Sequence, residues 1–230
     1  AEKALRERLG ADTETQARLA RAILDVRTRL GLPEQSGPTA SLLRDLALKS
    51  SGPDSDATLQ ALLEVGVAAS DAGRRVEAQT MLEEALALSA RLHGAAHGTT
   101  LGIRLRLAKL AIIGNDLAAA EMELDALIIA TEALGPDHGE LLGRTWSAKG
   151  SARERTGDAE GAAEAYANAG ALLAETLPPD SFPLLESQMS LARVHSTQGR
   201  TAEARELLET VVPKMRDRHG DEHPKTLAAL

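Results

Sequence analysis

Two pairs of histidines have a spacing that could support metal chemistry. His93 and His97 lie four residues apart, as do His219 and His223, and on a helix this spacing can hold zinc. Both pairs flank or lie within a Gly-rich link between apolar stretches, and an equivalent position recurs at His138. A residue type that recurs at regular intervals is explained more simply by link and helix-cap chemistry. We therefore expect no metal site.

Other signatures of catalysis are missing from the sequence. There is no G-x-x-x-x-G-K-[ST], H-E-x-x-H, G-x-S-x-G or G-x-G-x-x-G motif, which removes the common phosphate-loop, metalloprotease, hydrolase and dinucleotide signatures. The absence of cysteine excludes disulfides, thiolate–zinc sites and a cysteine nucleophile. Glu83 and Glu84 are adjacent on a predicted helix, so they point in different directions and indicate a solvated face. We expect this segment to be no enzyme and to need no cofactor.

The amino-acid composition excludes some classes of partner but identifies none. The net charge of −8 and the pI near 5.3 argue against nucleic-acid binding, which favours a basic surface. No run of 18 apolar residues occurs, so we expect no membrane insertion, and there is no signal peptide. A chain without cysteine fits a bacterial cytoplasm and a periplasm equally well, so the compartment stays open. Because the chain begins at Ala1 without Met, we expect a piece of a longer protein.

The residues that would position any site follow a strict period. Five turn residues stand 42 positions apart: Gly31, Gly73, Asn115, Gly157 and Gly199. Each follows an apolar stretch of helical spacing, and Gly and Asn accept the left-handed backbone that ends a helix. A fixed period of this size is typical of stacked supersecondary units. The sequence therefore predicts an all-α chain of five helix–turn–helix repeats in one solenoid domain spanning residues 1–230.

The expected repeats cover residues 12–53, 54–95, 96–137, 138–180 and 181–222. Residues 1–11 read as the end of a preceding helix, and residues 223–230 as the start of a further one. In repeat one the second helix should begin near Pro38, and Asp54 or Ser55 should cap the helix that follows. An unpaired helix at either end would expose apolar surface, which more protein or a second copy could cover.

Small and large residues alternate at fixed places beside each turn. Seven residues before the turn stand Leu24, Gly66, Ala108, Gly150 and Ala192; five residues after it stand Ser36, Ala78, Ala120, Ala162 and Ala204. Four residues further come Ala40, Leu82, Leu124, Tyr166 and Leu208. Close antiparallel helix contacts favour such pairing. We expect Gly150 and Ala162 to face one another, with Trp146 and Tyr166 nearby.

This pattern resembles the tetratricopeptide repeat. Trp146, Gly150, Gly157, Ala162 and Tyr166 match it best, although Lys149 stands in place of the usual leucine. The 42-residue period and links such as Gly135-Pro136-Asp137-His138-Gly139 and Gly220-Asp221-Glu222-His223-Pro224 resemble the kinesin-light-chain type of the repeat. The resemblance implies a right-handed superhelical solenoid. In bacteria it also implies the scaffold or sensor part of a larger signalling protein, including transmembrane Ser/Thr kinases.

The same resemblance implies a binding groove. In this family the concave wall is formed by first-helix residues that face away from the second helix. The residues expected to contact a partner are Arg18, Arg21, Lys109, Arg144, Arg155, Met189 and Arg193, and repeat two adds Gln60, Leu63, Val67 and Ser70. Cations around an apolar centre would suit an acidic peptide or a peptide carboxylate. The alternative is that these arginines form local salt bridges and bind nothing.

Three functions remain open from the sequence. The first is a scaffold that binds a protein or peptide in the groove. The second is the regulatory region of a transmembrane Ser/Thr kinase whose catalytic domain lies upstream, which would place this segment in the periplasm if it is the sensor. The third is homo-oligomerisation, for instance as a dimer, through the terminal helices.

Overall fold

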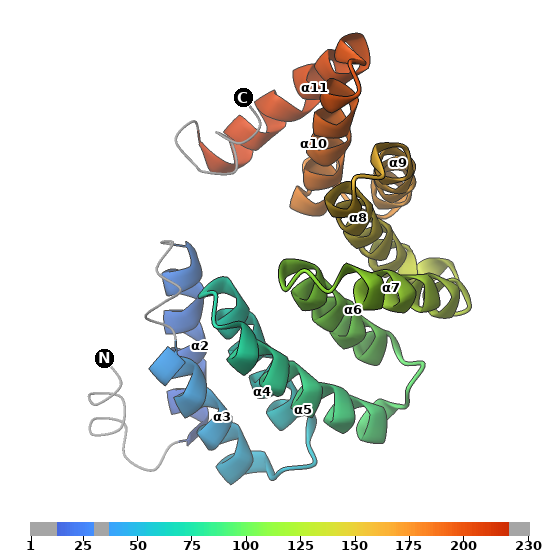
Figure 1. Ribbon diagram of the computed structural model, residues 1–230. Helices are drawn as coiled ribbons and strands as arrows, with labels where there is room; N and C mark the ends of the chain where they lie inside the picture. Colours follow the sequence, from blue (N-terminus) through green and yellow to red (C-terminus); the bar gives the residue numbers. More distant parts are fainter. Residues whose placement is uncertain (1–12, 30–36, 221–230) are drawn as a thin grey trace. The chain divides into compact units, whose positions relative to one another are not determined.

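The computed structural model describes residues 13–29 and 37–220 (Figure 1). Within these residues the secondary structure consists of ten α-helices and one short 3₁₀ helix, without a strand. The all-α fold expected from the sequence is confirmed. Gly31, Ser36 and the terminal segments 1–11 and 223–230 lie outside the described residues.

The helices alternate with tight turns and longer links along the chain. In order they are α2 (Thr13–Arg29), α3 (Gly37–Ser51), α4 (Asp56–Asp71), α5 (Arg75–His93), α6 (Gly98–Ile113), α7 (Leu117–Glu132), η2 (Pro136–His138), α8 (Gly139–Thr156), α9 (Ala159–Thr176), α10 (Phe182–Thr197) and α11 (Thr201–His219). None of the helices in the described part is long and apolar enough to cross a membrane.

Two compact units divide the chain within α6, at Ala1–Leu110 and Ala111–Leu230. In the first unit, α2 packs on α3, α3 on α4 and α4 on α5. Its core is aliphatic and includes Leu43, Leu82 and Ile103, all almost fully buried. In the second unit, α7 to α11 pack consecutively, and the pair α8 and α9 has the most extensive contact. The assignment to a single solenoid domain with five repeat boundaries stays a prediction.

The four described turn residues all adopt a left-handed backbone. Gly73, Asn115, Gly157 and Gly199 have φ values of 69°, 65°, 85° and 76°. In each turn the next residue donates its N–H to the carbonyl five positions back, at 2.9 Å, which is the hydrogen bond of a Schellman motif. These four periodic positions therefore end α4, α6, α8 and α10 as expected.

The links between pairs use a second set of glycines. Gly52, Gly94, Gly135 and Gly220 also have positive φ values, whereas α9 ends in the extended residue Leu177. The Oγ of Ser55 accepts a hydrogen bond from the N–H of Thr58 at 3.2 Å, so Ser55 is the expected cap of α4. This cap fixes where α4 begins.

Inside the pair α8 and α9, Gly150 lies against the ring of Tyr166, which was expected near it. A Cβ on Gly150 would meet the Tyr166 ring first, at 2.8 Å, rather than Ala162. Gly66 likewise lies against Leu82, at 3.0 Å. In both pairs the small residue of the first helix thus lies against the large residue of the second.

Candidate functional site

The candidate partner-binding residues all lie on the first helices of the pairs. Arg18 and Arg21 lie on α2, Lys109 on α6, Arg144 and Arg155 on α8, and Met189 and Arg193 on α10. Arg18, Arg21 and Lys109 belong to the first unit and the other four to the second. Each group is therefore described within its own unit.

In the first unit an ion pair connects the first helices of successive pairs. Arg21 Nε lies 3.1 Å from Glu64 Oε1, which joins α2 to α4. The side-chain amide of Gln60 donates to the same carboxylate oxygen at 3.1 Å. Arg18, nearly one turn earlier on α2, is exposed. Glu64 is thus held in one orientation by two neighbours.

A hollow of about 340 Å³ lies between α4 and α6 in the same unit. Its lining combines apolar and polar residues and consists of Gln60, Leu63, Glu64, Val67, Ala68, Asp71 and Arg106. Gln60, Leu63 and Val67 are three of the positions that the repeat pattern assigns to the concave wall. The volume lies at the lower end of the range found for ligand sites.

In the second unit the candidate cations have partners within the chain. Arg193 of α10 forms an ion pair with Glu154 of α8. Arg144 pairs with Glu140 at 2.7 Å, one turn away on the same helix. Arg155 donates to Asn115 Oδ1 at 3.3 Å. These contacts agree with the alternative that the arginines form local interactions within the chain.

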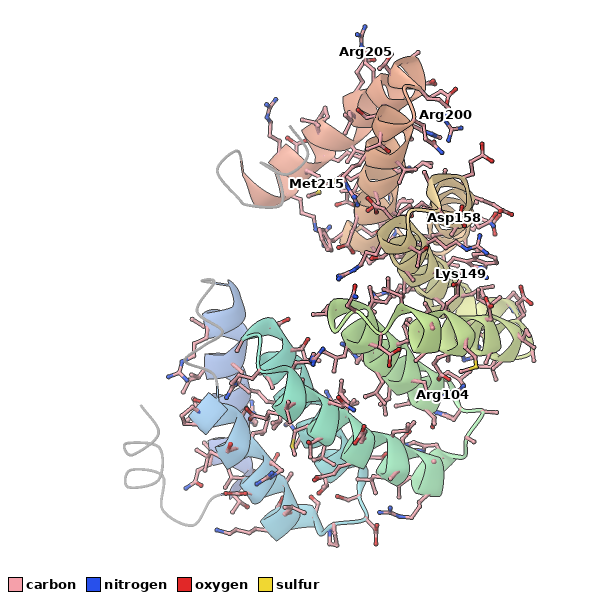
Figure 2. The ribbon with its side chains drawn as sticks, in the orientation of Figure 1. Arg104, Lys149, Asp158, Arg200, Arg205 and Met215 are labelled. Atoms are coloured by element: carbon pink, nitrogen blue, oxygen red, sulfur yellow. The ribbon has the colours of Figure 1, made fainter. Side chains whose placement is uncertain are left out.

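Met189 is half-buried and packs against Leu185, Val211 and Met215 in the core of the last pair. Figure 2 labels Met215 on α11. Only part of the Met189 side chain is therefore available to a ligand.

A second hollow, of about 660 Å³, was not expected from the sequence. It lies between α9 and α10 and is lined by Arg153, Asp158, Glu160, Gly161, Ala163, Glu164, Ala167, Leu191, His195 and Arg200; Asp158 and Arg200 are labelled in Figure 2. Arg153 Nε lies 3.5 Å from Glu121 Oε1 and 3.8 Å from Asp158 Oδ2. Acidic and basic groups thus neutralise one another in this hollow. Of these ion pairs, only the one between Arg153 and Asp158, which are five residues apart across a turn, could be predicted from the sequence.

The histidines of the first pair make link and cap contacts. His93 Nε2 lies 2.9 Å from Asp56 Oδ1, and His97 Nδ1 accepts from the N–H of Thr99 at 3.2 Å. Their rings stack with centroids 4.8 Å apart. In the part of the chain that the structure describes, no three His, Cys, Asp or Glu side chains are grouped closely enough to hold a metal ion. The structure describes neither the His219 side chain nor His223.

Tyr166, the only tyrosine of the chain, provides a test of packing in the second unit. Burial raises the pKa of its phenol above the usual value, although hydrogen bonds with Ser190 and Ser151 oppose this. Because the pKa of Tyr166 is higher in the folded chain, folding favours the neutral phenol. The phenol therefore contributes fully to the free energy of unfolding below pH ~10, and this contribution is lost as the pH rises through the pKa of the folded chain. In an absorbance titration, we expect ionisation at a higher pH in the folded than in the denatured chain. Equal midpoints would contradict the burial.

Known proteins with similar sequence or fold support the interpretation as repeats. The family model described as Tetratricopeptide repeat matches residues 58–98 and 184–225. No curated protein sequence matches the chain. The kinesin light chain TPR-like repeats of Podosopora anserina share 20% identity at a TM-score of 0.65, covering 91% of this chain and 99% of theirs. BtubC (BKLC) from P. vanneervenii shares 17% at 0.61, covering 94% and 95%.

A Rap protein complexed with Competence and Sporulation Factor shares 12% identity at a TM-score of 0.65, over 84% of this chain and 53% of that protein. At sequence identities of 20%, 17% and 12%, the similarity to these solved structures shows the fold alone. Gly73 and Gly199, which lie in the two matched segments, have the same left-handed turn backbone as Asn115 and Gly157. The chain thus contains tetratricopeptide repeats at residues 58–98 and 184–225, and its fold is similar to that of kinesin-light-chain-like repeat proteins.

Proposed function

We propose that the chain binds a peptide or protein segment through residues of its first helices, with one contact site in the hollow between α4 and α6 of the first unit. The tetratricopeptide fold supports a protein-interaction scaffold and gives no support for an enzyme in this segment. The observation that carries the proposal is the hollow between α4 and α6, where wall positions of the repeat form a concave, partly apolar surface. The Rap protein of similar fold was solved in complex with Competence and Sporulation Factor, which is in line with such a role.

The lining of the hollow indicates what kind of ligand group it would accept. Leu63, Val67 and Ala68 form the apolar part of the lining, here called the apolar floor, and the limited volume suits one aliphatic side chain of an extended or helical peptide. Gln60 can donate or accept hydrogen bonds with a peptide backbone, and Glu64 can accept them. Burial of that aliphatic side chain would supply most of the affinity, since about 25 cal/mol per Å² of apolar surface is gained.

The preference for an acidic ligand is a separate part of the proposal. Arg144 and Arg193 already pair with Glu140 and Glu154, so an acidic ligand would have to replace or share these carboxylates. Exposed pairs of this type contribute little, about 0–1 kcal/mol each, so the exchange would cost little. Regulation of a Ser/Thr kinase and homo-oligomerisation through the terminal helices stay predictions from the sequence.

Selection of peptides from a random display library on the intact chain would test the groove. For the enriched peptides, we expect Val67→Glu to weaken binding at least tenfold, because it puts a carboxylate on the apolar floor. Val76→Glu is the matched control, since Val76 lies on α5, is 76% exposed and does not line the hollow. Unchanged dissociation constants for a folded Val67→Glu chain would place the binding site elsewhere.

The preference for acidic ligands can be tested with the same peptides. The triple variant Lys109→Glu, Arg144→Glu and Arg193→Glu should abolish binding of acidic peptides and retain the helical circular dichroism spectrum. Neutral apolar peptides should be affected much less. Equal loss for both classes, or a loss of thermal stability, would favour purely local ion pairs.

A further inference from the structure

Helix α7 exposes a continuous apolar stripe. Met122 and Ile129 are 72% and 69% exposed, and Ala119, Ala126 and Ala133, the last of which caps the helix, are exposed as well. The spacing of three and four residues places all five on one side of the helix. Figure 1 shows α7 in yellow-green, next to α8 in the second unit. Large apolar side chains exposed in a row mark interaction surfaces more often than single ones do.

The other repeats show that this stripe is a departure from the pattern of the array. At offsets of 42 residues, the equivalent positions of α5 are Glu77, Thr80, Glu84, Ala87 and Arg91; those of α9 are Gly161, Glu164, Asn168, Ala171 and Glu175; those of α11 are Glu203, Glu206, Thr210, Pro213 and Asp217. Each of these helices has at least two charged residues there, and α7 has none. The repeat fold therefore does not require apolar residues on this face.

The order of side chains along the stripe suits a helix as its partner. Small residues alternate with large ones, from Ala119 through Met122, Ala126 and Ile129 to Ala133. The alanines let another backbone come close, and Met122 and Ile129 can insert between the side chains of a facing helix. A methionine also adapts to partners of different shape.

The charges on α7 distinguish between possible partners. The helix carries Glu121, Glu123, Asp125 and Glu132 and no Lys or Arg. Glu121 and Asp125 pair with Arg153 and Lys149 of α8 along one edge of the stripe, where Glu132 is also exposed, and Glu123 lies on the other edge. Two such helices in contact would bring carboxylates together, which disfavours a second copy of this chain.

We propose that the α7 stripe (Ala119, Met122, Ala126, Ile129 and Ala133) docks an amphipathic helix of another protein that carries basic residues beside its apolar face. The apolar side chains would supply the contact, and Lys or Arg of the partner would face Glu132 and share the partly exposed carboxylates of Glu121 and Asp125 with Arg153 and Lys149. This surface shares no residue with the hollow between α4 and α6, so the proposal does not depend on the groove function.

Two designed helical peptides with the same Leu/Ala face would test the proposal, one with lysines and one with glutamates along the edges. We expect the basic peptide to bind the full chain in fluorescence anisotropy, at least tenfold more tightly than the acidic one. The double variant Met122→Glu and Ile129→Ala, which introduces the residue types of α9, should weaken this binding at least tenfold. Val76→Glu, on the exposed side of α5, should leave it unchanged.

Equal binding of both peptides, or no binding of either, would overturn the proposal. So would unchanged binding by the double variant. Sedimentation of the chain alone would reveal self-association. If the chain forms a dimer and the double variant does not, the stripe binds a second copy of the chain, and the proposal of a basic helical partner is overturned. Melting curves of the variants identify any loss of fold, and single substitutions at Met122 and Ile129 then repeat the comparison.

Discussion

Gly150→Ala is expected to destabilise the second unit, although alanine is the better helix former. The new Cβ would lie 2.8 Å from Cδ1 and Cε1 of the Tyr166 ring, closer than carbon atoms approach in folded proteins. The ring is buried and its hydroxyl donates to Glu154 Oε2 at 3.2 Å, so it has little room to move. Overpacking of this kind costs about 1–3 kcal/mol, which exceeds the gain of about 1 kcal/mol in helix propensity.

Gly170→Ala is the matched control in the facing helix. Gly170 lies within α9, and no heavy atom lies within 4 Å of the position of its added Cβ. This substitution should stabilise the chain by about 0.5–1 kcal/mol, because it restricts the unfolded chain without a clash. Thermal unfolding followed by circular dichroism should therefore shift down for Gly150→Ala and up for Gly170→Ala. Shifts in the same direction would show that α8 and α9 are not in this close contact.

The fold could be predicted because its signals are local and repeated. A left-handed turn needs Gly or Asn, and the hydrogen bonds that end a helix involve residues within five positions of one another. Gly73, Asn115 and Gly157 therefore revealed the period directly. The cap at Ser55 follows from the same short-range chemistry.

The contacts between helices were harder to predict. The sequence places Ala162 and Tyr166 on the same side of α9, and only the helix crossing decides which of them meets Gly150. The same holds for the candidate site: Arg21 and Glu64 are 43 positions apart, and Arg193 and Glu154 are 39 apart. Such pairs depend on side-chain placement between repeats, which no local pattern determines.

The apolar stripe on α7 was missed for a different reason. Apolar residues on a helix are ordinarily interpreted as core, and α7 has them on more than one side. Only the exposure of Met122 and Ile129 separates the stripe from the buried face formed by residues such as Leu124 and Leu127. Comparison of equivalent positions across the repeats could have raised the question from sequence alone.

The second large change in stability is expected from the ion pair of Lys149. This lysine occupies a position where the repeat usually has leucine. The residue is only 8% exposed and its ammonium pairs with Asp125 of α7, while the Trp146 ring centroid lies 5.2 Å from Nζ. Asp125→Ala would leave a largely buried ammonium without its carboxylate. Because Asp125 is itself 53% exposed, solvent moderates the loss, and we expect about 1–3 kcal/mol of destabilisation.

Lys149→Leu should behave in the opposite way, since an apolar side chain at a buried position removes the cost of desolvating a charge. Replacement of buried ion pairs by apolar residues is often neutral or stabilising. The urea concentration at the unfolding midpoint of the Lys149→Leu chain should therefore equal or exceed that of the original chain. In the Lys149→Leu background, Asp125→Ala should cost little, because no ammonium remains to be neutralised. A double-mutant cycle measures this directly. If the two substitutions instead add independently, the carboxylate of Asp125 does not stabilise the charge on Lys149, and the burial of that lysine must be sustained by the Trp146 ring.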